Sequence, residues 1–512
     1  MSNKASDQLH KLIKSMSKPE KRYFKVFSSR HIIGDENNYQ TLFDAIDKLD
    51  DYDEEKLMKK FKDKVFVQRF SIAKNRLYNA LLKSLDSFHA NSSVEAQLHR
   101  QVHSAEILYN KSLYDQSLKV LHSARKVAEK HEILHLLAEI SKWEKRILEK
   151  NNYDDIQDEA QLNEILEKDI EVNEKLRINS ELWNIKSRLF SQLYRQGKVR
   201  NESETKMFER ILHDAKSKWS GKEVGIENEY MLQHISSAYH FALGQYAECY
   251  PYLKQNIALI EGNPHLFEEE PGIYLSVLSN TIYVGMRLGE WKEAFQFLEQ
   301  LRAYPATLAE RMNEDLEIRL FALGKSTELT LYAQSGEFEK GLEMIPEIKL
   351  GLGAFDEHLS NVRKAHFYFN IAVIYFGLEQ YHEALKWVNK LLNNVDIDKT
   401  KDIHCIAQIL NLVIHLELGN KDLLPYTLRS TQRFLSTRNK VYEFENVMLS
   451  FVNEMLKKRS SKNPENQYQQ LISELENLRK NPFEQFVFEY FDFLAWAKSK
   501  QNGKKFREQL AA

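Results

Sequence analysis

A short signature recurs along this chain and constrains its fold more than any other feature. It consists of a glycine, any residue, an aromatic residue and, three positions later, a small residue. Its three clearest copies are Gly244 with Tyr246, Gly289 with Trp291, and Gly336 with Phe338. Each copy lies between two stretches whose apolar residues recur at helical spacing, which predicts a turn between two helices.

Weaker copies extend the same register over most of the chain. With the aromatic residue, or the residue in its place, taken as a marker, successive markers are 39 to 47 residues apart. The eight markers are Tyr114, Tyr153, Val199, Tyr246, Trp291, Phe338, Tyr381 and Lys421. A mean spacing of about 44 residues accommodates two helices of about 18 residues and connections of about four. The spacing therefore predicts a stack of about eight helical hairpins, each buried only against its neighbours.

The residue types at these hinges have physical reasons. Glycine ends the first helix because it accepts a left-handed backbone conformation that costs other residues about 1 kcal/mol or more. The small residue three positions after the aromatic lets the two helices approach closely. The residues that we assign to the hinges are Tyr114, Tyr153, Gly197, Gly244, Tyr246, Gly289, Trp291, Ala294, Gly336, Phe338, Gly341, Tyr381 and Ala384.

The hinges over about residues 100–440 resemble the tetratricopeptide repeat superfamily, in which a Gly-x-Tyr-x-x-Ala turn joins the two helices of each unit. The nearest copy is residues 370–392, which matches at Ala372, Tyr375, Tyr381, Ala384 and Val388. This chain departs from the family at Glu379, which replaces the hinge glycine, and in a spacing longer than the usual value of about 34 residues. The resemblance implies an all-α, right-handed solenoid that binds a protein or peptide along its concave face.

Composition agrees with long helices and argues against some classes of partner for the chain as a whole. The chain has only 17 glycines and 9 prolines in 512 residues, and its formal charge of -2 argues against a surface wholly devoted to nucleic acid or anionic membrane. Cys249 and Cys405 form no CxxC pair, and we expect both to be buried. The polar stretch at the start lacks the apolar core of a leader peptide and no run of about 18 apolar residues occurs, so we expect no leader, no membrane span and a cytoplasmic protein.

We divide the chain into an N-terminal helical module (1–98), helical repeats (99–440) and C-terminal helices with an aromatic cap and a basic tail (441–512). In the module, Ser17 and Glu20 predict the start of one helix, and an apolar stripe predicts a longer helix near residues 66–89.

Charge in the module is polarised. Residues 44–55 carry a net charge of -6, and residues 56–84 carry +8. One interpretation is a nucleic-acid-binding regulator in which Lys74 and Arg76 contact phosphates while the repeats act as a sensor or dimerisation arm. The other is a pair of helices whose charges neutralise each other.

The C-terminal region is unusually aromatic. Its aromatic residues are Phe483, Phe486, Phe488, Tyr490, Phe491, Phe493 and Trp496. We expect this region to cap the end of the stack, with binding of a partner or of a second copy as the alternative. After Trp496 the chain is basic, and we expect a loose tail.

One catalytic motif occurs, His131-Glu132-Ile133-Leu134-His135, which matches the HExxH signature of zinc metallopeptidases. We expect it to be coincidental, because it lies where one helix should end and the next should begin. No phosphate-binding or dinucleotide-binding glycine loop is present. We therefore expect a non-catalytic scaffold that uses no cofactor or metal and binds a protein or peptide partner.

Overall fold

The computed structural model describes residues 7–29, 38–154, 156–199, 202–219, 224–308, 312–394, 396, 402–436, 442–457, 464–481 and 483–510. Every regular element within these ranges is a helix, which confirms the all-α prediction for them. None of the helices so described is both long and apolar enough to span a membrane. The chain divides into two compact units, residues 1–176 (unit 1) and 177–512 (unit 2), so one boundary falls inside the region that we assigned to repeats.

Unit 1 begins with a small helical module that has its own core. Its helices are α1 (Gln8–Ser15), α2 (Lys18–Ser29), α3 (Asn38–Asp47), α4 (Glu54–Lys60), η1 (Val65–Arg69) and α5 (Phe70–Phe88). The Glu20 amide donates to the Ser17 hydroxyl, and Glu20 Oε2 accepts from the Ser17 amide at 2.6 Å, a reciprocal cap that fixes the start of α2 as the sequence predicts. Phe24, Leu77 and Leu81 are buried in the core.

Four helices continue the chain from the module. They are α6 (Val94–Asn110), α7 (Tyr114–Lys130), α8 (Leu134–Lys150) and α9 (Glu159–Gln196), and the last begins in unit 1 and ends in unit 2. The prediction of two helices of about 18 residues in every period is wrong for the period between Tyr153 and Val199, where α9 runs for 38 residues. The reason is local, because no glycine or proline occurs within α9 to end the helix.

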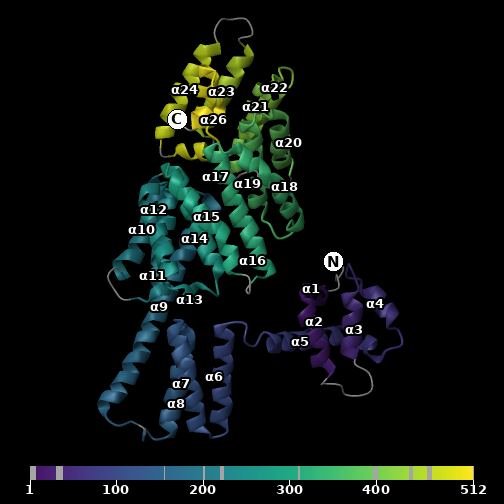
Figure 1. Ribbon diagram of the computed structural model, residues 1–512, viewed down its shortest axis with the longest axis vertical. Helices are drawn as coiled ribbons and strands as arrows, with labels where there is room; N and C mark the ends of the chain where they lie inside the picture. The colour runs from purple at the N-terminus through teal and green to yellow at the C-terminus, as the bar shows by residue number, and fades with distance from the viewer. Residues whose placement is uncertain are drawn as a thin grey trace. The chain divides into compact units, whose positions relative to one another are not determined.

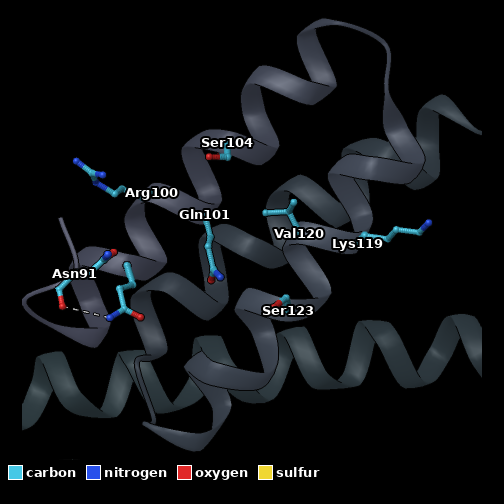
Figure 2. Close-up of a pocket in the computed structure, with 8 residues that line it drawn as sticks. Asn91, Arg100, Gln101, Ser104, Lys119, Val120 and Ser123 are labelled. Atoms are coloured by element: carbon cyan, nitrogen blue, oxygen red, sulfur yellow. Dashed lines mark hydrogen bonds between the residues drawn. The ribbon is translucent and has the colours of Figure 1, made fainter. Parts of the chain in front are cut away.

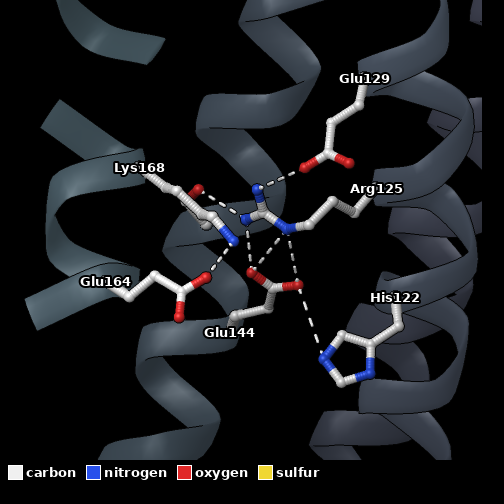
Figure 3. Close-up of polar contacts among 7 residues, drawn as sticks. His122, Arg125, Glu129, Glu144, Glu164 and Lys168 are labelled. Carbon is white, nitrogen blue, oxygen red and sulfur yellow. Dashed lines mark hydrogen bonds and ion pairs between the residues drawn. The ribbon is translucent and has the colours of Figure 1, made fainter. Parts of the chain in front are cut away.

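A charged network joins α7 to α8 in unit 1 (Figure 3). Arg125 Nε donates to both carboxylate oxygens of Glu144 at 3.2 Å, and its guanidinium also donates to Ser141 Oγ at 2.8 Å. His122 pairs with Glu144 at 4.0 Å. Burial disfavours the charge of Arg125, but the bonds to Glu144 outweigh burial and raise the guanidinium pKa. This network ties together two helices that are neighbours in sequence.

Unit 2 contains most of the helical pairs, which follow one another along the chain (Figure 1). Its helices after α9 are α10 (Glu202–Trp219), α11 (Ile226–Ala242), α12 (Tyr246–Gly262), α13 (Pro264–Phe267), α14 (Pro271–Leu288), α15 (Trp291–Thr307), α16 (Glu314–Arg319), η3 (Leu320–Lys325), α17 (Ser326–Ser335), α18 (Phe338–Ala354), α19 (Asn361–Gly377), α20 (Tyr381–Leu392), α21 (Asp402–Glu417), α22 (Leu424–Ser436), α23 (Glu443–Lys457), α24 (Pro464–Lys480), η4 (Gln485–Glu489), α25 (Phe493–Asn502) and α26 (Phe506–Leu510). The first helices α14, α17, α19 and α21 contact one another in series. The result is a repeat-like helical stack.

The hinges between paired helices share one backbone geometry. At seven of the eight markers, the residue two positions before the marker has a left-handed φ between +60° and +77°. These residues are Ser112, Gly197, Gly244, Gly289, Gly336, Glu379 and Gly419. At the remaining marker, Tyr153 itself is left-handed and half exposed.

The aromatic marker often begins the second helix of a pair. Tyr114, Tyr246, Trp291, Phe338 and Tyr381 are the first residues of α7, α12, α15, α18 and α20. The small residues that follow are buried, and an added Cβ at Gly341 would lie 2.3 Å from Ile374 Cδ1. The hinge signature therefore marks both the turn and the close approach of two helices.

The first helices of the later pairs are buried on nearly all sides. In α19, residues 367–376 are all buried, and in α21 the same holds for residues 409–415. A helix that packs only against its own layer would keep one polar face towards solvent. Other parts of the chain must therefore cover the remaining face of these helices.

Candidate protein-binding site

The C-terminal segment, defined here as residues 483–510, supplies much of this cover. It contacts side chains from several successive helical pairs of unit 2. We call these side chains the receiving surface, which consists of Lys198, Tyr246, Tyr283, Arg287, Gln334, His366, Phe369 and Phe376. These contacts come from Lys198 after α9 and from α12, α14, α17 and α19, so the segment meets several successive helical pairs.

The Glu489 carboxylate is the polar centre of the contact. Lys198 Nζ lies 2.7 Å from Glu489 Oε1, and the Tyr283 hydroxyl donates to Oε2 at 2.8 Å. The Tyr246 hydroxyl donates to Oε1 as well. Burial opposes ionisation of Glu489, but the charges of Lys198 and Arg287 outweigh it and hold the carboxyl pKa below its ordinary value. Glu489 is therefore an anion in a largely buried site.

Aromatic rings surround the Lys198 ammonium. Its Nζ lies 4.8 Å from the ring centroid of Phe241, 4.9 Å from that of Tyr246 and 5.9 Å from that of Tyr283. Such rings attract a cation through their negative faces and limit how far it can move. Lys198 comes directly after the hinge residue Gly197, whose φ of +76° turns the chain at the end of α9. Hinge geometry thus positions the principal cation of the site.

Two side chains of the receiving surface bind the main chain of the C-terminal segment. Arg287 donates to the Glu489 carbonyl oxygen at 2.7 Å, and Gln334 Nε2 donates to the Tyr490 carbonyl oxygen at 3.1 Å. Arg287 lies on α14 and Gln334 on α17, so adjacent pairs bind consecutive residues of the segment. Bonds to backbone carbonyls hold a peptide chain irrespective of its side chains.

Apolar contacts continue along the segment. The Tyr490 ring stacks on His366 with centroids 6.1 Å apart and meets Phe369 edge to face at 6.0 Å. Phe491 meets Phe376 at 5.1 Å. Burial, together with the charge of Arg363, lowers the pKa of His366 to about 4, so this ring is neutral near pH 7. The segment therefore combines one buried anion with a row of packed rings.

The basic tail is docked, so the expectation of a loose tail is wrong as far as Leu510. Lys500 forms an ion pair with Glu417, and Arg507 forms one with Glu339. The Phe506 ring lies parallel to that of Phe338, with centroids 6.1 Å apart. The basic residues are held because acidic side chains on α18 and α21 face them, and the local sequence does not reveal these distant partners.

The predicted phosphate contacts have different surroundings. Lys74 forms an ion pair with Glu54 and donates to the Tyr52 hydroxyl at 3.1 Å, whereas Arg76 is exposed. Two further acids of the acidic run, Asp44 and Asp47, pair with lysines of α2 at 2.7 Å. Part of the acidic run thus neutralises basic side chains of the same module.

The HExxH residues do not lie on one helix. His131 is the C-cap of α7, Glu132 has a left-handed φ of +48°, and His135 is the second residue of α8. The motif requires two histidines one turn apart on a single helix, so this geometry does not produce its metal site.

Unit 1 also contains a cavity of about 520 Å³ beside α6 and α7 (Figure 2). Its lining is largely polar and includes Gln101 and Ser104 from α6 and Lys119 and Ser123 from α7. Gln97 Nε2 donates to the Asn91 carbonyl oxygen at 3.4 Å at its edge. No buried charge comparable to Glu489 is among its lining residues.

Sequence reasoning identified Tyr246 only as a hinge residue, and it missed Lys198, Tyr283, Arg287, Gln334 and Glu489. One signal was available, because Glu489 is an acid enclosed by aromatic residues in the run 486–491. An acid in such a setting needs a cationic partner when it is buried. No protein-family model matches this sequence, and no curated protein matches it either.

Proposed function

We propose that this chain is a non-catalytic scaffold that binds a segment of a partner protein on the receiving surface of unit 2. The supporting observation is that this surface already holds a peptide segment, residues 483–510, through a buried carboxylate, two backbone carbonyls and packed rings. These are the contacts by which one protein recognises a peptide of another.

The chemistry of the surface defines the partner that it suits. Lys198 and Arg287 favour a carboxylate, while His366, Phe369 and Phe376 favour aromatic side chains directly after it. The partner would carry an acidic residue followed by aromatic residues in an irregular or 3₁₀ conformation, as residues 485–491 do.

The C-terminal segment would then compete with the partner. A tethered segment acts at an effective concentration of about millimolar, so a partner must bind tightly or reach the surface when the segment has left it. The segment thereby sets the lowest affinity at which a partner can displace it from the receiving surface.

The finer features of the fold belong to the same proposal. The stack would be right-handed and related to tetratricopeptide repeats, its last helices would cap one end, and the protein would act in the cytoplasm. The left-handed hinges and the helical pairs of unit 2 support the relation to tetratricopeptide repeats.

The test is a pull-down from native lysate with the full chain, performed with and without nuclease. Retained proteins are then challenged with a synthetic peptide of residues 483–510 and with a scrambled peptide of the same composition. The proposal expects a partner that survives nuclease and is released by the native peptide alone. Partners that vanish with nuclease would contradict it and favour nucleic-acid binding through the N-terminal module. Partners that both peptides leave in place would show that the receiving surface is not the site.

A further inference from the structure

A second candidate site lies in unit 1. It includes one residue of the HExxH motif, His135, but not the geometry of that motif. Glu95 and His99 on α6 and His135 on α8 each offer one ligand atom, and these atoms all lie within 4.8 Å of one another. Glu95 Oε1 is 3.0 Å from His135 Nε2 and 3.8 Å from His99 Nε2. This is the one group of three such residues found among the residues that the structure describes.

Two helix starts determine this arrangement. Glu95 and His99 are four residues apart, which places both side chains on one face of α6. The start of α6 is fixed by Ser93, whose hydroxyl accepts from the Ala96 amide at 3.0 Å. The start of α8 follows the left-handed Glu132, and α8 packs against α6, which brings His135 to the same face. The positions of the three ligands therefore follow from where α6 and α8 begin.

The ligand set selects a class of metal ion. Two imidazole nitrogens and one carboxylate oxygen suit zinc, copper, nickel and cobalt, whereas magnesium and calcium prefer oxygen ligands alone. In a tetrahedral zinc site, nitrogen and oxygen ligands about 2.0 Å from the ion lie about 3.3 Å from one another. The two separations from Glu95, 3.0 Å and 3.8 Å, lie on either side of this value, and the ligand atoms of the two histidines are at most 4.8 Å apart. Rotation of the exposed histidine side chains would bring all three atoms to the distances of a zinc site. A water molecule would take the fourth position, since all three side chains are exposed.

We propose that Glu95, His99 and His135 bind one divalent transition-metal ion, with zinc as the representative, and that the ion clamps the start of α8 to the start of α6. The site differs from the HExxH centre in where its ligands lie, because Glu95 and His99 come from α6 and only His135 belongs to the motif, while His131 and Glu132 are not in the group. Its effect is to stabilise the contact between α6 and α8, since an ion that binds only the folded form raises its stability.

The experiment titrates Zn²⁺ into the full chain after treatment with a chelator and its removal, and follows binding by calorimetry. Visible absorption of bound Co²⁺ reports the coordination geometry independently. The changes are His99→Ala and His135→Ala. The matched controls are His131→Ala, which removes the other histidine of the HExxH motif, and His103→Ala, which removes an exposed histidine of the same helix α6.

The wild-type chain is expected to bind one zinc ion at this site, and each of the two substitutions is expected to weaken that binding by about tenfold or more. Both controls should bind as the wild type does. All replaced side chains are at least partly exposed, so circular dichroism should show an unchanged helical content. Absence of saturable zinc binding, survival of the binding in both His99→Ala and His135→Ala, or its loss in His131→Ala would overturn the proposal.

Discussion

Each unit contains a charged network, and the two networks differ in the parts of the chain that they join. In unit 1, Arg125 and Glu144 are 19 residues apart and lie on consecutive helices. In unit 2, Lys198 and Glu489 are 291 residues apart, and the segment that carries Glu489 is not one of the repeated pairs. The first network reinforces packing that the helical hairpin would form without it. The second holds a segment that repeat packing alone would leave unplaced.

This difference separates the contacts that hold a helical pair together from those that hold the C-terminal segment in place. A helical pair is held by apolar packing along its whole length, so one ion pair contributes little to its existence. Around Glu489 the C-terminal segment forms the short 3₁₀ helix η4, and the side chains that contact it come from several pairs. Substitutions in each network should therefore have different effects on stability.

Replacement of Glu489 should have the largest effect. In Glu489→Ala, Lys198 loses its carboxylate partner in a site where the lysine and glutamate side chains are only 19% and 10% exposed, whereas Arg287 keeps its bond to the main-chain carbonyl. Loss of one partner of a buried ion pair costs about 3–5 kcal/mol of unfolding free energy. Urea denaturation measures this loss for the full chain. The double variant Lys198→Met, Glu489→Leu should recover much of it, and a single variant as stable as the wild type would contradict the role of the pair.

Replacement of Arg125 should have a smaller and more local effect. Arg125→Met removes the bonds to Glu144 and Ser141. A hydrogen bond to a charged group contributes about 1.5–3 kcal/mol to the free energy of unfolding. Hydrogen exchange should increase in α7 and α8 and remain unchanged in unit 2. In Glu489→Ala, by contrast, exchange should increase both in the C-terminal segment and near Lys198. Equal patterns in the two variants would remove the distinction between the networks.

Mild acid should weaken unit 2. Burial and a neighbouring cation, Arg363 for His366 and Lys186 for His234, lower the pKa of each histidine to about 4. The ordinary value is about 6.5, so the unfolded chain binds these protons first. Stability is therefore complete above about pH 6.5 and falls as the pH drops towards 4, by at most about 1.4 kcal/mol per pH unit for each histidine. The melting temperature, measured across this pH range, should fall less steeply with decreasing pH in His366→Gln than in the wild type. An equal slope in the two proteins would count against a buried neutral His366.

Substitutions at the hinges should change the stability of unit 2 least, and two such substitutions should change it in opposite directions. Glu379→Gly should stabilise unit 2 by about 1 kcal/mol, because Glu379 holds a left-handed φ of +60° that glycine adopts without strain. Gly289→Ala should destabilise it by a similar amount, although an added Cβ at Gly289 would meet nothing within 4 Å. Denaturation midpoints of both variants provide the measurement. A change of the same sign in the two would show that left-handed strain is not the cause.

The sequence predicted those parts of the molecule that depend on nearby residues. Gly244, Gly289 and Gly336 predicted turns because left-handed backbone has a strong residue preference, and Ser17 with Glu20 predicted a helix start for a similar reason. The marker Tyr153 was less informative, since no break follows it within α9. A spacing pattern does not reveal where two short helices fuse into one.

The receiving surface could not be predicted in the same way. Its contacts join Glu489 to Lys198, Tyr246 and Tyr283, which lie more than 200 residues earlier. The local sequence of each residue agrees with several roles, and Tyr246 serves both as a hinge and as a hydrogen-bond donor to Glu489. The same limitation explains the docked tail, because Lys500 and Arg507 have acidic partners that only the fold brings near them.

If the receiving surface binds the C-terminal segment as it would bind a partner, it should also bind that segment when the segment is supplied as a separate peptide. A labelled peptide of residues 483–510 is titrated into the full chain carrying Glu489→Ala, and fluorescence anisotropy and the unfolding midpoint are followed. We predict saturable binding that raises the midpoint, with a peptide that itself carries Glu489→Ala binding about tenfold or more weakly. Absence of binding by the native peptide, or equal binding by the two peptides, would contradict the account.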